Sequence, residues 1–259
     1  MSEVTKNPWT ELRRLTAARI ALGRAGTSLP TSAHLDFQFD HARARDAVHR
    51  PLDADAVEAA LHAQNLDVFR VHSAAPDRAT YLQRPDLGRR LDESSREKLQ
   101  PNPCDLALVV ADGLSSLAIE TNVAPFLAVL LPMLRQENFT LGPVALAAQS
   151  RVALGDEIGQ ALGAKIVLVL IGERPGLSSP DSMGLYLTYA PQKGRTDADR
   201  NCISNIRPEG LTYTAAARKT IYLLGAAQKR GLSGVQLKDE TDADGLTLTS
   251  EAVEASGFG

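Results

Sequence analysis

The stretch Ile171-Gly-Glu-Arg-Pro-Gly-Leu-Ser-Ser-Pro-Asp-Ser182 follows an almost continuous apolar run, Ala164-Lys-Ile-Val-Leu-Val-Leu170. Apolar, β-branched runs of this length are typical of strands that are covered on both faces of a parallel sheet. The charged residues Glu173 and Arg174 come directly after the run, where the strand should end. Because open α/β sheets bind ligands beyond the carboxyl ends of their strands, this stretch predicts both the fold class and a candidate binding site.

Predicted strands and helices alternate around this stretch. Strands are expected over residues 106–111, 144–148, 165–171 and 185–189, and helices over residues 124–135, 155–162 and 213–228. The alternation predicts an α/β fold with a Rossmann-like, mostly parallel sheet.

The chain divides into three predicted regions. Residues 1–100 are expected to form an N-terminal helical region, with helices over 11–22, 32–48, 55–61 and 92–99. Residues 101–238 are expected to form the Rossmann-like domain. Residues 239–259 are acidic and glycine-rich, which is typical of a flexible tail.

Composition excludes several classes of protein. The net charge of −3 gives no electrostatic support to nucleic-acid binding. The two cysteines, Cys104 and Cys202, belong to no metal-binding or disulfide pattern, which predicts a reducing, cytoplasmic location. The first ten residues lack the apolar core of a signal peptide. The longest apolar runs are predicted strands that glycine or charged residues interrupt. They are shorter than the roughly 20 residues that a membrane span needs, so no span is expected.

Three polar segments are expected to meet at the carboxyl ends of the strands, namely residues 112–116, 149–156 and 172–176. Asp112 and Ser115 in the first segment also fit a simple role in capping a helix and closing a turn. Arg151 and Glu173 could form a salt bridge between neighbouring loops, or Glu173 could contact a ligand. The residue pattern leaves both alternatives open.

Phosphate-binding and hydrolase motifs are missing from the sequence. Neither GxGxxG nor GxxxxGK[ST] occurs, which disfavours ordinary dinucleotide or ATP binding. Ser178, Ser179 and Ser182 supply hydroxyl groups, but a catalytic triad also needs a histidine base, and no GxSxG motif is present. The five histidines all precede residue 73: His34, His41, His49, His62 and His72.

Two further segments have both a structural and a functional interpretation. Residues 195–206 form a predicted polar loop, in which Cys202 is either a small buried apolar residue or part of a ligand-binding surface. Arg43 and Arg45 lie on a predicted helix, and Tyr81-Leu-Gln-Arg-Pro-Asp-Leu-Gly-Arg-Arg-Leu91 is rich in arginine. These arginines are either solvated or part of a docking face for a partner subunit.

Six long segments resemble, in order and spacing, the small subunit of ethanolamine ammonia-lyase. The likeness extends from about residue 11 to residue 237, and it rests on residues 19–26, 81–91, 111–115, 151–159, 171–180 and 201–206. The resemblance implies a Rossmann-like domain that lies against a large subunit with a TIM-barrel fold. It also implies that the two subunits together hold adenosylcobalamin and convert ethanolamine to acetaldehyde and ammonia.

The resemblance implies that Val152, Glu173 and Cys202 contact the cobalamin, with Glu173 accepting a hydrogen bond. It assigns no catalytic residue and no metal ligand to this chain, and it implies a higher hetero-oligomer. Such a cofactor carries out the difficult chemistry while the protein supplies orientation and enclosure. Some members of the family have a longer N-terminal extension that is linked to bacterial microcompartments, whereas little precedes Glu11 here. Residence in a microcompartment therefore stays open.

Two other functions compete with this one. A non-catalytic module that binds a cobalamin or nucleotide would share the same scaffold. A self-sufficient hydrolase would need Ser178 or Ser179 as nucleophile, together with a histidine brought from the N-terminal region.

Overall fold

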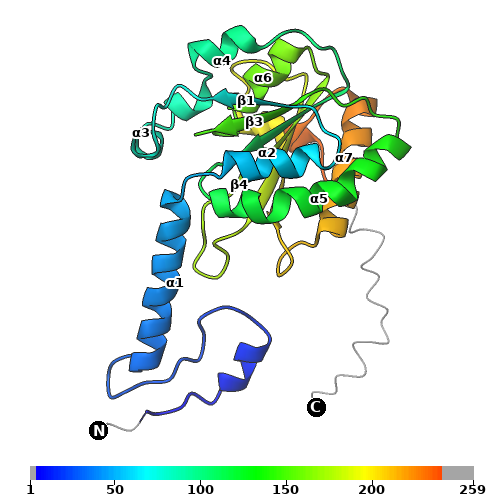
Figure 1. Cartoon of the computed structure of the whole chain (residues 1–259). Coiled ribbons are helices and arrows are strands. Elements are labelled where there is room, and N and C mark those ends of the chain that lie inside the picture. Colours follow the sequence, from blue (N-terminus) through cyan, green and yellow to red (C-terminus); the bar gives the residue numbers. More distant parts are fainter. Residues whose placement is uncertain (1–3, 241–259) are drawn as a thin grey trace, which may run out of the picture.

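The computed structural model describes residues 4–240, which build an α/β body around a six-stranded sheet (Figure 1). The strand order is β1-β3-β2-β4-β5-β6; the first four strands in this order are parallel, and β5 and β6 are antiparallel to their neighbours. The strands are β1 (Val68–His72), β2 (Leu106–Ala111), β3 (Val144–Ala148), β4 (Ile166–Gly172), β5 (Met183–Tyr189) and β6 (Arg200–Ile206). The expected mostly parallel, Rossmann-like sheet is thus confirmed.

Most helices begin at a polar residue whose side chain satisfies a free backbone N–H group. Asp53, Asp77, Asp92, Ser115 and Thr212 act in this way. The α-helices are α1 (Thr31–His49), α2 (Ala54–His62), α3 (Arg78–Gln83), α4 (Glu93–Lys98), α5 (Ser116–Gln136), α6 (Leu154–Leu162) and α7 (Tyr213–Arg230). Short 3-10 helices are η1 (Thr10–Arg14), η2 (Leu87–Arg89), η3 (Asp197–Asp199) and η4 (Gly234–Gln236).

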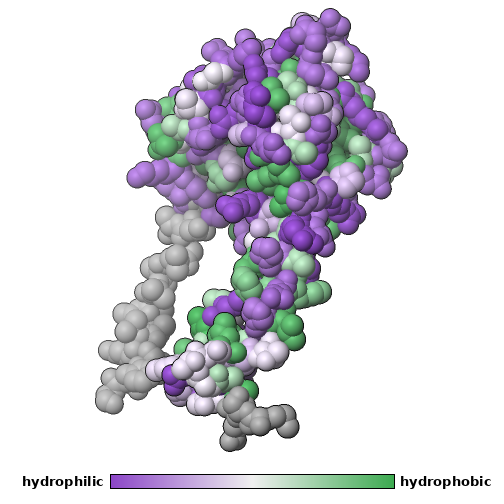
Figure 2. Space-filling model, turned by 90° about the vertical axis from the view of Figure 1, so that its left-hand side faces the viewer, coloured by the Kyte–Doolittle hydropathy of each residue, from purple (hydrophilic) through white to green (hydrophobic). Residues whose placement is uncertain are grey.

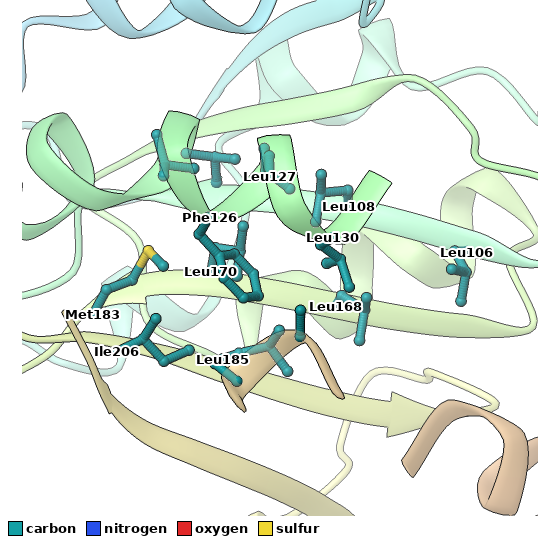
Figure 3. Close-up of a cluster of buried hydrophobic side chains, with 14 of the residues drawn as sticks. Leu106, Leu108, Phe126, Leu127, Leu130, Leu168, Leu170, Met183, Leu185 and Ile206 are labelled. Carbon is teal, nitrogen blue, oxygen red and sulfur yellow. The ribbon is translucent and has the colours of Figure 1, made fainter. Parts of the chain in front are cut away.

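Helices cover both faces of the sheet. Side chains of α2, α5 and α7 pack on one face, where Leu108 and Leu168 meet Phe126, Leu127 and Leu130 of α5 (Figure 3). Helix α6 packs on the other face, against the alternate residues of the same strands. Each fully buried Leu or Phe side chain stabilises the fold by about 1.5–3 kcal/mol. Apolar cores on both faces of the sheet therefore hold its strands, and the ends of these strands, in place.

Helix α5 is the helix of the described chain that is long and apolar enough to cross a membrane. One such helix is weak evidence for a span, because the core helix of a soluble protein passes the same test. Ten of its residues are buried, among them Phe126 and Leu130 in the core cluster. The prediction that strands are the longest apolar candidates is therefore wrong.

The central strands and the last two helices agree closely with the sequence-based prediction. Residues 106–111 and 144–148 are strands with the predicted bounds, and α6 and α7 differ from prediction by one and two residues. Helix α5 begins eight residues earlier than predicted. The polar residue Asn122 does not interrupt the helix, because its buried side-chain amide is hydrogen-bonded. Its Nδ2 donates to the carbonyl oxygens of Ala118 and Asp181, at 2.9 and 2.8 Å.

Three predictions on local structure are wrong. The helix expected over 11–22 is reduced to η1, because these residues have no core against which a helix could pack. Strand β1 lies in the region that was expected to be helical. Residues 200–206 form β6 rather than a loop, since pairing with β5 satisfies their backbone despite their polar side chains. Residues 241–259 of the expected tail lie outside the described residues.

Residues 4–46, named the arm here, extend away from the α/β body (Figure 1). The arm contains the N-terminal segment and most of α1. Of residues 4–46, Pro30 alone is buried. The arm therefore contributes almost nothing to the hydrophobic core.

Candidate functional site

A pocket of about 470 Å³ lies beyond the carboxyl ends of β2, β3 and β4. The chain leaves β2 toward α5 on one face of the sheet and leaves β3 toward α6 on the other, which opens a crevice between them. All three predicted segments contribute to the pocket. It is lined by Tyr81, Gly113, Leu114, Arg151, Val152, Ile171, Gly172, Glu173, Arg174, Tyr186 and Ser204.

Asp112 ties the loop after β2 to the loop after β3. Its buried carboxylate accepts hydrogen bonds from the backbone N–H groups of Gln149 and Ser150, both at 2.9 Å. Burial raises the pKa of Asp112 above its usual range, while these hydrogen bonds oppose the shift. Ser115 caps α5, accepting from the N–H of Ala118 at 3.3 Å. Ser115 thus has the expected capping role, whereas Asp112 joins two loops instead of capping a helix or closing a turn.

Two glycines let the ends of β2 and β4 touch through their backbones. A Cβ atom on Gly172 would lie 2.0 Å from the carbonyl oxygen of Ser115. A Cβ atom on Gly113 would lie 2.2 Å from the carbonyl oxygen of Gly172, and Gly113 has a φ of +57°. Any side chain at these positions would push the floor of the pocket apart.

Tyr81 forms one wall of the pocket, and two arginines lie over its ring. The guanidinium groups of Arg78 and Arg151 lie 4.8 and 4.3 Å from the centre of its ring. Its hydroxyl donates to the carbonyl oxygen of Ser150 at 3.0 Å. Burial raises the pKa of Tyr81, so the phenol stays neutral at physiological pH. Arg78 also donates from Nη1 to the carbonyl oxygen of Gly113 at 2.8 Å, which links the wall to the floor.

No ion pair joins Arg151 to Glu173. Arg151 stacks on Tyr81 instead, and its Nη2 contacts the carbonyl oxygen of Tyr81 at 3.4 Å. The salt bridge considered from the sequence is therefore wrong. Arg151 and Glu173 both line the pocket, but different neighbours hold them in place.

Glu173 is half-buried and is held by three donors. The hydroxyl of Ser182 donates to Oε2, the hydroxyl of Ser204 donates to Oε1 at 2.5 Å, and the backbone N–H of Asn205 donates to Oε2 at 3.1 Å. Asn205 has a φ of 59°, a left-handed conformation that asparagine tolerates better than most residues. The carboxylate is thus fixed at the rim of the pocket by Ser182, which directly precedes β5, and by Ser204 and Asn205 of β6.

Val152 lines the pocket directly, whereas Cys202 lies beside it. Cys202 is opposite Tyr186 in the β5–β6 pairing, and Tyr186 lines the pocket. The cysteine is exposed, so its interpretation as a buried apolar residue is wrong. Nearby protein atoms nevertheless partly desolvate the thiol and raise its pKa, which disfavours an activated thiolate. The three residues singled out from the sequence therefore lie around one crevice.

None of the hydroxyl groups considered for hydrolysis is paired with a histidine. Ser182 is bound to Glu173, and Ser178 lies in a separate hollow formed with the arm. None of the histidines is hydrogen-bonded to Ser178, Ser179 or Ser182; His72, for example, contacts the carbonyl oxygen of its neighbour Ser73 through Nδ1 at 2.7 Å. Within residues 4–240, no cluster of three or more His, Cys, Asp or Glu side chains could hold a metal ion. The geometry gives a hydrolase no support.

The fold and the pocket define an α/β protein with an open crevice at the carboxyl edge of its sheet. Residues 6–238 match the model of the ethanolamine ammonia-lyase light chain family, and the chain belongs to this family. Small subunits of ethanolamine ammonia-lyase are among its relatives. The one from Azotobacter vinelandii is 58% identical, with 93% of this chain and 92% of the relative covered. The one from Pseudomonas fluorescens Pf-5 is 56% identical, with 98% and 95% covered.

Three pocket residues were not singled out as candidate site residues from the sequence, namely Tyr81, Tyr186 and Ser204. Tyr81 was noted within an arginine-rich stretch, but no local pattern places it against residues 70 positions later. Tyr186 and Ser204 occupy strand positions whose direction depends on the β5–β6 pairing. The contact of Ser204 with Glu173 depends on the pairing of β6 with β5, which no local sequence signal gives.

Proposed function

We propose that this chain covers one side of adenosylcobalamin in ethanolamine ammonia-lyase, at the interface with a large TIM-barrel subunit, and that Val152, Glu173 and Cys202 contact the cofactor. The observation that carries the proposal is the open crevice with a fixed carboxylate at its rim. When bound, adenosylcobalamin would supply the radical chemistry. This chain holds and shields the cofactor, and the large subunit binds the substrate.

The carboxylate and the apolar side chains of the crevice fit the amide groups at the edge of a corrin. A carboxylate oxygen can accept about two hydrogen bonds, and Oε1 of Glu173 accepts one from Ser204. This leaves one acceptor site for an amide N–H of the cofactor. The partly buried side chains of Val152 and Tyr186 offer apolar contact around it. No proton transfer is required of these residues.

The size of the crevice supports a shared site. Pockets of several hundred Å³ bury a drug-sized ligand, and this one measures about 470 Å³. Adenosylcobalamin is considerably larger, so most of its surface would stay open to water on this chain alone. A second protein surface is therefore needed to exclude solvent from the cofactor. A cytoplasmic location is part of the proposal, which does not include residence in a microcompartment.

The division of labour is tested by measuring ammonia release from ethanolamine. We expect none from the purified chain with adenosylcobalamin, and we expect turnover when the cognate large subunit is added. Turnover by this chain in isolation would overturn the assignment of substrate binding to the partner. Lack of turnover from the complete mixture would overturn the proposed enzyme function itself.

Replacement of Glu173 tests its contact with the cofactor. In the assembled enzyme, we expect Glu173→Ala to weaken cobalamin binding by about 1–3 kcal/mol, because one desolvated hydrogen bond is lost. Cobalamin titration followed by absorbance gives the dissociation constant. Glu97→Ala, at an exposed position of α4, is the matched control and should leave it unchanged. If Glu173→Ala lowers the melting temperature but not the affinity, Glu173 only braces the loop.

A further inference from the structure

Large apolar side chains are exposed along the arm to a degree that the body does not show. Of the ten large hydrophobic residues exposed in the described chain, nine lie in the arm. Figure 2 shows apolar surface along this part of the molecule. The nine are Val4, Trp9, Leu12, Leu15, Ile20, Leu29, Leu35, Phe37 and Phe39. Concentrations of exposed apolar residues of this kind mark surfaces that bind another protein or a membrane.

Polar contacts shape the arm without burying it. Thr5 and Arg24 pair through their backbones at 2.8 and 3.0 Å, and Arg19 forms an ion pair with Asp40 at 2.5 Å. Exposed contacts of this kind contribute about 0–1 kcal/mol each. Most of the stability of helices in proteins comes from tertiary packing, and α1 has Ala47 as its one buried residue. The apolar side chains must therefore be buried elsewhere for the arm to be held firmly.

The arm leaves the body beside the candidate site. Arg78 donates from Nε to the carbonyl oxygen of Val48, at the base of α1, and from Nη1 to that of Gly113 in the pocket, both at 2.8 Å. Ser178, on the loop that follows Glu173, lines a hollow together with Arg13 and Phe39 of the arm. A partner that closes the pocket would thus also meet the arm.

The charge of the arm helps to identify its occupant. The arm has seven lysine and arginine residues and four aspartate and glutamate residues, whereas the whole chain has a net charge of −3. Pairing of two arms would bring like charges together, which disfavours an arm-to-arm dimer. A partner with an apolar groove bordered by carboxylates matches the arm in both respects.

We propose that the arm docks into such a groove on the large subunit and anchors this chain to it. The inference rests on the proposed function, because it takes the large subunit as the polypeptide that closes the site. The anchoring side chains project from two parts of the arm. Trp9 and Leu15 are 66% and 83% exposed in the N-terminal segment, and Leu35 and Phe39 are 57% and 64% exposed one helical turn apart on α1.

Paired substitutions test the docking without cofactor present. Leu35→Ser with Phe39→Ser, and separately Trp9→Ser with Leu15→Ser, should each raise the dissociation constant for the large subunit at least tenfold, as measured by calorimetry. Val235→Ser is the matched control, because Val235 is 71% exposed but lies in the body. Circular dichroism should show unchanged folding for all three variants, since the replaced side chains are exposed. Binding within twofold of wild type for both pairs would overturn the inference.

Trp9 supplies an independent signal, because it is the chain's single tryptophan. The difference in emission between wild type and Trp9→Phe should shift to shorter wavelength when the large subunit is added. An unshifted spectrum in a complex that does form would overturn docking of the arm and leave the proposed function intact. Failure of the wild-type chain to bind the large subunit would overturn both. A dimer of this chain that the paired substitutions dissociate would identify a second copy as the occupant and overturn the proposal.

Discussion

Gly172 and Gly225 show how differently the same residue type can act in this chain. The space around Gly172 is filled by the backbone of the neighbouring loop, since a Cβ there would meet two carbonyl oxygens at 2.0 and 2.6 Å. Gly225 lies in α7, and a Cβ there would meet nothing within 4 Å. Close backbone contact at the pocket therefore depends on Gly172, whereas Gly225 only adds flexibility to the unfolded chain.

Replacement of each glycine by alanine should change stability in opposite directions. We expect Gly172→Ala to lower the free energy of unfolding by at least about 2 kcal/mol, because the loops after β2 and β4 must separate. Gly225→Ala should raise it by about 0.5–1 kcal/mol through its effect on the helix. Urea denaturation of the full chain measures both. A Gly172→Ala variant as stable as wild type would show that the pocket floor can deform freely.

At the scale of elements, Asp105 connects the starts of neighbouring strands. Its carboxylate accepts hydrogen bonds from the N–H and hydroxyl of Thr140, at 2.9 and 2.6 Å, and from Lys165 at 2.8 Å. These contacts, Lys165 first, lower the pKa of Asp105 to about 2. The carboxylate thereby joins the start of β2 to the segment before β3 and to the start of β4.

Asp105 should make the stability of the sheet depend on pH. Because its pKa is lower in the folded chain, its contribution is fully present above the unfolded value near 3.8 and is lost as the pH falls toward 2. We expect Asp105→Asn to destabilise the chain by about 1–2 kcal/mol at pH 7, discounted for partial exposure to solvent, and by less as the pH approaches 3. Urea denaturation across this range gives the comparison. The exposed Asp67, just before β1, supplies the control Asp67→Asn. A difference that stays constant with pH would contradict the assignment.

At the scale of the whole molecule, the body and the arm are held by different forces. The body has a core on both faces of its sheet, whereas Pro30 is the single buried residue of the arm. Removal of residues 4–46 should therefore change the free energy of unfolding by less than about 1 kcal/mol. Circular dichroism during urea denaturation measures this change. A larger loss would mean that the arm packs on the body more than its exposure indicates.

Local pattern predicted the centre of the sheet but failed at its edges. Strands β2 and β3 have continuous apolar runs, so their bounds could be read from the sequence. Strands β1 and β6 are at the two edges of the sheet, and their polar residues, such as Arg70 and Asn201, hide the strand pattern. The helix expected over 11–22 failed for the opposite reason, since its helical pattern has no surface to pack against.

The sequence by itself determined the α/β class, the family, and the three strand ends that form the candidate site, because apolar runs and the turns after them are local features of the chain. Only the tertiary structure decided which side chains surround that site. Arg78 and Arg151 lie over the ring of Tyr81, and Glu173 is held by Ser182 and Ser204. Most of these partners are far apart along the chain, and the packing of both faces of the sheet brings them together.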